Sequence, residues 1–218
     1  MYHLFNPENK FWNFIAKITD VACMSILWAL VSLPVFTIGA TTTAFYDFAL
    51  HQVNDREGKI LKSFFSSFKA HFGRATLLWL IELAGIAFLA LDLWAAWNFF
   101  LAKGGVAGIA LLGFCGCIAI IFLSCLMYVY PLLAAFNFKL KKILHDSFIM
   151  AMGNLHVTIT LFVMTALVCV LIYYVSGLFF FWIGLYIFFS AYFITGVFLK
   201  YVRDPEEEGE KGKEQLEE

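Results

Sequence analysis

The sequence predicts an all-α membrane protein: a polytopic bundle of about five transmembrane helices with an amphipathic helix on the cytoplasmic side. Of its 218 residues, 62% are hydrophobic and only 14% are charged, whereas soluble domains contain about 25% charged residues. Three stretches of 26, 35 and 53 residues contain no Asp, Glu, Lys or Arg, and about 20 apolar residues can cross a bilayer as a helix. These stretches are apolar on every helical face, unlike the alternating strands of a membrane β-barrel.

The first predicted span runs from Thr19 to Phe45 and contains the most distinctive local pattern of the membrane region. Pro34 removes a helical hydrogen bond, and Gly39 permits a bend or a close approach of another helix. Neighbouring threonine hydroxyls can bond to the carbonyls that the proline frees. We therefore expect a kink, with Pro34, Gly39, Thr41 and Thr42 as its candidate residues. Broken helices also line ligand sites in transporters.

An amphipathic helix is expected next, over Ile60 to Phe72. Its apolar side chains recur at offsets of 0, 3, 4, 7 and 11 residues, which places them on one helical face. Such a face can enter the acyl boundary while lysines meet anionic lipid, or it can dock into a groove of another protein. The candidate membrane-surface or partner contacts are Leu61, Phe64, Phe65, Phe68, Phe72, Lys62 and Lys69.

The second predicted span, Ala75 to Asn98, is apolar but contains two acidic residues, Glu82 and Asp92. They are ten residues apart, about 280° around a helix, so they do not share a face. A carboxylate inside the membrane is unfavourable unless it is paired or protonated, which makes Glu82 a candidate functional residue. It can serve as an interhelical hydrogen-bond acceptor, as a contact to a partner subunit, or as a proton or substrate site.

The other three spans are expected over Val106 to Tyr130, Val157 to Val175 and Leu178 to Leu199. The last two share one charge-free stretch that is long enough to fold back as a hairpin, with Ser176 and Gly177 at the turn. Residues 1–202 would then form one helical transmembrane domain. Residues 203–218 are rich in charges, which predicts a disordered, acidic cytoplasmic tail.

The distribution of Lys and Arg predicts the orientation in the membrane. With five spans, twelve of these residues fall on one side, and Lys10, Lys17 and Lys103 fall on the other. The N-terminus is therefore expected outside and the C-terminus in the cytoplasm. The first apolar stretch lacks a small-residue cleavage pattern, so we do not expect it to be a cleaved signal peptide.

No motif in the sequence indicates catalysis, a cofactor or a metal. The five histidines lack the spacing of a metal site, and glycine-rich phosphate-binding loops and nucleophile elbows are absent. The five cysteines lie in apolar runs without a CxxC pair, as small packing residues do. The net charge of −1 provides no field to attract nucleic acid. We therefore expect a non-enzymatic protein without cofactor, metal or nucleic-acid partner.

Three segments resemble the YesL family of small bacterial integral membrane proteins, a family defined by a domain of unknown function. They are NPENKFWNF, SLPVFTIGATTTAFYDF and LKSFFSSFKAHFGRATLLWLI, and the resemblance is most specific from Leu33 to Thr42. It implies a multi-span helical protein of the bacterial cytoplasmic membrane. Members are often encoded beside sugar-importing ABC systems and polysaccharide-degrading enzymes, and the family implies no catalytic residues.

The expected function is an accessory or assembly subunit of carbohydrate ABC import. Permease subunits and the lipid bilayer would be its partners, and Ile60 to Phe72 and Lys139 to Asn154 its contact surfaces. The chain lacks an EAA-type loop of the kind that couples permeases to their ATPase, so we do not expect a permease. The alternative is a self-sufficient small transporter or channel that uses the break from Pro34 to Thr43 and Glu82. A sensor would need a soluble sensing domain, and the sequence leaves the oligomeric state open.

Overall fold

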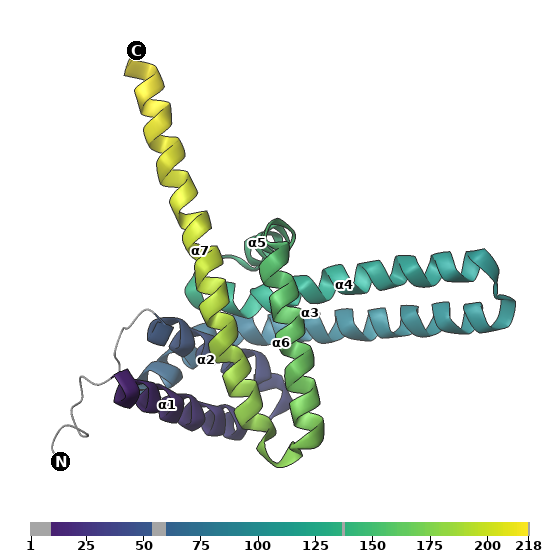
Figure 1. Cartoon of the computed structure of the whole chain (residues 1–218), viewed down its shortest axis with the longest axis horizontal. Helices are drawn as coiled ribbons and strands as arrows, with labels where there is room; N and C mark the ends of the chain where they lie inside the picture. Colours follow the sequence, from purple (N-terminus) through teal and green to yellow (C-terminus); the bar gives the residue numbers. More distant parts are fainter. Residues whose placement is uncertain (1–9, 54–59, 137, 218) are drawn as a thin grey trace.

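The structure, a computed structural model, describes residues 10–53, 60–136 and 138–217. Within these ranges the chain is helical throughout apart from short connections, so the predicted all-α class is confirmed (Figure 1). The elements are α1 (Lys10–Val31), the 3-10 helix η2 (Val35–Thr37), α2 (Ile38–Val53), α3 (Ile60–Lys103), α4 (Gly105–Ala135), α5 (Leu140–Gly153), α6 (Leu155–Tyr174), the 3-10 helix η3 (Ser176–Leu178) and α7 (Phe179–Glu217).

Four segments of the described residues are long and apolar enough to cross a membrane. They are Leu61–Ala102 in α3, Gly105–Ala135 in α4, Leu155–Tyr174 in α6, and Ser176–Tyr201 over η3 and the first part of α7. A polytopic membrane protein is thereby confirmed as the fold class. This count covers the described residues only, and within them the expected first span is divided among α1, η2 and α2.

The predicted span from Thr19 to Phe45 is not one helix. α1 ends at Val31, and α2 starts at Ile38 after a turn that contains Pro34. Two hydrogen bonds join the two helices, Gln52 to Asp20 and Trp28 to Thr42, both at 3.1 Å. A third joins Ser32, just past the end of α1, with Thr41 at 2.7 Å. The residues of α2 that form these bonds come earlier in the chain as their partners come later, so α1 and α2 run antiparallel. The expected kink is therefore a reversal of chain direction.

α2 forms the centre of the molecule. It contacts α1, α3, α4 and α7, and ten of its 16 residues are buried. Among the largest fully buried side chains are Phe45 of α2, Met24 of α1, Phe64 of α3 and Tyr128 of α4. The hydrophobic core therefore lies around α2, where helices from both halves of the chain meet.

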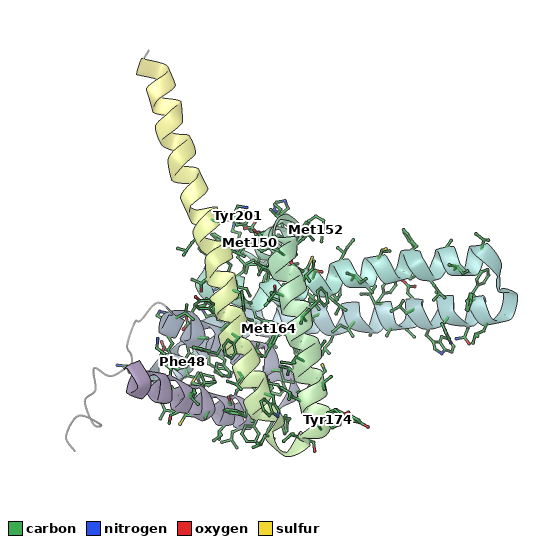
Figure 2. All side chains as sticks on the ribbon, viewed as in Figure 1. Phe48, Met150, Met152, Met164, Tyr174 and Tyr201 are labelled. Carbon is green, nitrogen blue, oxygen red and sulfur yellow. The ribbon has the colours of Figure 1, made fainter. Side chains whose placement is uncertain are left out.

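α3 and α4 form a long antiparallel hairpin that projects away from this core (Figure 1). Its tip lies at Gly104 and Gly105, whose φ values of 58° and 73° suit residues without a Cβ atom. Among the residues from Leu80 to Leu123 whose burial the structure describes, only Ala96 and Gly108 are buried. Figure 2 shows the consequence: side chains crowd together where α7 crosses the core, whereas along the hairpin they lie between the two helices or project away from them.

The predicted amphipathic helix and second span are parts of one continuous helix, α3. The only helix-weakening residue between them is Gly73, and one exposed glycine costs about 1 kcal/mol without ending a helix. The 44 residues of α3 extend about 66 Å, roughly twice the thickness of a hydrocarbon core. Only part of α3 can therefore lie within the bilayer core.

α6 and α7 form a second hairpin, with the predicted turn at Ser176 and Gly177 inside η3. The two hairpins run in different directions, and α7 packs against α1 and α2 of the core (Figure 1). The sequence predicted a disordered tail over residues 203–218, whereas the structure describes α7 as helical through Pro205 to Glu217. Glu, Lys, Gln and Leu dominate this segment, and all four have high helix propensity.

Candidate functional site

The turn between α1 and α2 satisfies its own backbone through hydroxyl groups. The Thr37 hydroxyl lies 2.6 Å from the carbonyl oxygens of both Val31 and Pro34. The Thr37 amide also donates to the Pro34 carbonyl at 2.8 Å. Carbonyls freed by a break in a membrane helix need such partners. Here they come from within the turn, which makes the reversal a stable element of the structure.

The remaining threonines of the segment also have partners. The Thr41 hydroxyl lies 2.9 Å from the Ile38 carbonyl and 2.7 Å from the Ser32 hydroxyl. Thr43 donates to the Gly39 carbonyl at 2.8 Å, and Thr42 accepts from Trp28. A ligand that bound these hydroxyls would have to displace existing hydrogen bonds.

Gly39 lies where α2 comes closest to α3. A Cβ atom at this position would lie 2.5 Å from the Ala75 carbonyl oxygen and 2.8 Å from the Trp79 Cβ. Both atoms are backbone or directly attached to it, so neither can move without shifting α3. The predicted close approach at Gly39 is thus made to a specific part of α3.

Glu82 accepts a hydrogen bond from the Tyr130 hydroxyl, which joins α3 to α4. Glu82 is three residues past Trp79, so it lies about one helical turn from the contact with Gly39. The structure thereby brings the carboxylate and the break between α1 and α2 into one region. Asp92 lies about 15 Å further along α3 and does not join them.

Tyrosine hydroxyls connect helices throughout this region, and sequence reasoning missed them. Besides Tyr130, the buried hydroxyl of Tyr46 lies 2.9 Å from the Ser190 hydroxyl and joins α2 to α7. Tyr128 and Thr158 are 3.0 Å apart and join α4 to α6. A tyrosine in an apolar helix indicates a need for a hydrogen-bond partner, but the sequence does not identify that partner.

The predicted apolar face of Ile60 to Phe72 is divided between two environments. Phe64 is fully buried, and its ring stacks on Phe68 with centroids 6.2 Å apart. Leu61 and Phe65 are instead 62% and 43% exposed. The other exposed candidate contacts are Phe72, Lys62 and Lys69. Because α2 covers part of the segment, only the outward part can meet lipid or another molecule.

The second expected contact surface, Lys139 to Asn154, contains helix α5. One face of α5 is buried through Ile143, Ser147, Met150 and Ala151. At its end, the Asn154 amide donates to the Tyr201 hydroxyl at 3.3 Å, which ties α5 to α7. The buried face is occupied by the protein itself, so any external contact uses the exposed face, which contains Leu144, Phe148 and Ile149 as well as lysines.

Metal-ligating side chains do not gather in the part of the chain that the structure describes. No group of three or more His, Cys, Asp or Glu residues there is placed to hold a metal ion. The candidate region around Gly39, Glu82 and Tyr130 therefore offers hydroxyls and one carboxylate as its chemistry.

Comparison with known proteins supports the resemblance. Residues 21–93 match a family described as "Protein of unknown function, DUF624". The chain is 24% identical over 178 residues to the uncharacterized protein YesL of Bacillus subtilis (strain 168), which covers 81% of this chain and 82% of that protein. It is 26% identical over 172 residues to the uncharacterized protein YteU of the same organism, which covers 78% of this chain and 74% of the relative. No solved structure matches the chain. The resemblance to a YesL-like family of unknown function is thus confirmed.

Proposed function

We propose that this protein is a non-enzymatic membrane subunit that assembles with another membrane protein through the α3–α4 hairpin. The observation that carries the proposal is the isolation of this hairpin. From Leu80 to Leu123, among the residues whose burial is described, only Ala96 and Gly108 are buried. Two helices of bilayer length thus contact little besides each other here, and most of their outward surface is apolar.

Two glycines of α4 favour a protein over lipid alone as the cover of this surface. These two are Gly113 and Gly116, because nothing lies within 4 Å of a Cβ built at either. Gly85 and Gly108 differ from them, since each makes room for a ring inside the hairpin, Phe122 and Phe100 respectively. Glycine weakens a helix by about 1 kcal/mol relative to alanine. In membranes, small residues commonly let a second helix approach closely, which is the role that we assign to Gly113 and Gly116.

The partner that we propose is the permease of a carbohydrate ABC importer. This assignment is supported by the resemblance to the YesL family, whose members are often encoded beside such importers. Assembly through lipid-facing helices suits a partner that is itself membrane-embedded.

We also propose a revised orientation in the bacterial cytoplasmic membrane. The outward N-terminus required a continuous first span, but α1 and α2 form an antiparallel pair with both ends on one side (Figure 1). With four spans, 14 of the 15 Lys and Arg residues fall on the cytoplasmic side, and only Lys103 falls outside. This asymmetry exceeds the twelve to three of the five-span arrangement, and it supports cytoplasmic N- and C-termini.

Co-purification from native membranes in mild detergent tests the assembly. Permease subunits are expected to accompany the wild-type chain and to be lost from a Gly113→Leu, Gly116→Leu variant, because the added side chains block close approach. Gly196→Leu in α7 is the matched control, since a Cβ there also meets nothing within 4 Å. A wild-type chain that migrates alone, together with unchanged sugar uptake after its deletion, contradicts the proposal.

A second candidate, a small transporter or channel, is favoured by one observation. A carboxylate that pairs with a tyrosine lies about one turn of α3 from the contact with Gly39, at the start of α2 after the break, as in membrane sites that handle ions. Liposomes containing the purified protein would then conduct protons or take up sugar, and Glu82→Gln would abolish the flux. Wild-type liposomes without flux contradict this candidate.

A further inference from the structure

The outward face of the first turns of α3 contains a groove of about 420 Å³, which we call the α3 groove. Its lining residues are Leu61, Lys62, Phe65, Ser66 and Lys69. Most of the lining is apolar, although two of the five side chains carry a positive charge. The groove lies opposite the buried side of the same helix, which packs through Phe64 and Ser67.

Helical spacing arranges the lining residues as two adjacent strips. Leu61 and Phe65 are four residues apart and form the apolar strip. Lys62, Ser66 and Lys69 follow at spacings of four and three residues and form a strip of hydrogen-bond donors. Neither lysine forms an ion pair or hydrogen bond with another residue that the structure describes. Two positive charges without an ion-pair partner among the described residues therefore flank an exposed apolar surface.

The position of the groove in α3 places it near a membrane surface. α3 is too long to lie wholly in the hydrocarbon core, and its charged residues before Ala75 mark the part that lies outside. Exposure of Leu61 and Phe65 to water would be unfavourable. At the lipid interface the apolar strip can contact acyl chains, and the strip of donors can contact headgroups. The groove thus meets acyl chains on one side and headgroups on the other.

We propose that the α3 groove binds an anionic phospholipid. Its phosphate would accept hydrogen bonds from Lys62, Ser66 and Lys69, and the upper part of an acyl chain would pack on Leu61 and Phe65. A net negative headgroup matches the positive charges of Lys62 and Lys69, and an acyl chain matches the apolar strip. A zwitterionic phospholipid lacks the net charge, and free phosphate lacks the chain.

Lipid retention by the full-length protein in mild detergent tests this assignment. Native mass spectrometry would count bound phosphatidylglycerol and phosphatidylcholine with identical acyl chains. The wild-type chain is expected to retain phosphatidylglycerol preferentially, and Lys62→Gln with Lys69→Gln is expected to lower its affinity about tenfold or more. Lys141→Gln with Lys200→Gln is the matched control, because it removes two exposed lysines elsewhere and leaves the groove intact.

A second variant and a second ligand separate lipid from other anions. Leu61→Ser is expected to weaken phosphatidylglycerol binding while both charges remain. Equal retention of the two lipids by the wild-type chain overturns the proposal, as does unchanged phosphatidylglycerol binding in the Lys62→Gln, Lys69→Gln variant. If inorganic phosphate alone reproduces the thermal stabilisation that phosphatidylglycerol produces, the groove is a free-anion site and the lipid assignment is wrong. These outcomes do not depend on whether the α3–α4 hairpin assembles with a permease.

Discussion

At the scale of single residues, the most constrained contact of the candidate region is that of Gly39 with α3. A Cβ atom there would come within 2.5 Å of the Ala75 carbonyl oxygen, so Gly39→Ala must push α2 and α3 apart. We expect a loss of about 1–3 kcal/mol of stability, measured as a lower melting temperature in detergent. Gly73→Ala is the control, because nothing lies within 4 Å of its Cβ. Equal melting temperatures for the two variants would contradict the contact.

The pair of Glu82 and Tyr130 makes a second prediction at this scale. Tyr130→Phe removes the hydroxyl that donates to the carboxylate, and losing a partner of a charged group typically costs about 1–3 kcal/mol. In a chain that already contains Glu82→Leu, the same change should cost much less, because the acceptor is gone. Thermal unfolding of the four proteins of this cycle measures the coupling.

Tyr173→Phe is the matched control for this cycle. Tyr173 is 82% exposed near the turn of the second hairpin, so removing its hydroxyl should change stability by less than about 0.5 kcal/mol. Strictly additive effects of Tyr130→Phe and Glu82→Leu would show that the hydrogen bond contributes nothing to stability.

At the scale of helices, the antiparallel pair of α1 and α2 changes the expected topology. Because α1 begins and α2 ends on one side, topology reporters fused to the N-terminus and to the C-terminus should both report the cytoplasm. Two reporters should be used at each terminus, one that is active only in the cytoplasm and one that is active only outside, so that each result is checked by the other. A reporter that is active outside when fused to the N-terminus would restore the five-span arrangement and would contradict the paired helices.

The turn itself shows what a proline signal can and cannot predict. Pro34 indicates that a helix is interrupted, because it lacks an amide hydrogen. The direction in which the chain continues depends on distant partners, here the bonds from Trp28 to Thr42 and from Gln52 to Asp20. A kink and a full reversal therefore look alike in the sequence.

At the scale of the whole molecule, both hairpins must fit one bilayer although they point in different directions (Figure 1). The 20 residues of α6 extend about 30 Å, which matches an average hydrocarbon core. We therefore expect greatest thermal stability in vesicles with a core of about 30 Å, and lower stability in thinner and thicker bilayers. Phosphatidylcholine vesicles of increasing chain length provide the series. Stability that rises steadily across the whole series would contradict this fit.

The amino-acid sequence by itself determined the fold class and the positions of the apolar helices. Lipid offers no hydrogen bonds to the backbone, so a long apolar stretch must fold as a helix whatever surrounds it. Because lipid does not satisfy charged side chains or free backbone carbonyls either, the sequence also identified Glu82 and the break at Pro34 as unusual features. It also placed the turn at Ser176 and Gly177, because one charge-free stretch was long enough for two spans.

Only the tertiary structure decided what these features contact. The partner of Glu82 is 48 residues away, that of Tyr46 is 144 residues away, and no local pattern encodes such a pairing. The apolar face of Ile60 to Phe72 was visible in the sequence, but its division into a buried side and an exposed groove follows from the packing of α2. Helix formation depends on bonds between residues four apart, whereas the site depends on which distant surfaces meet.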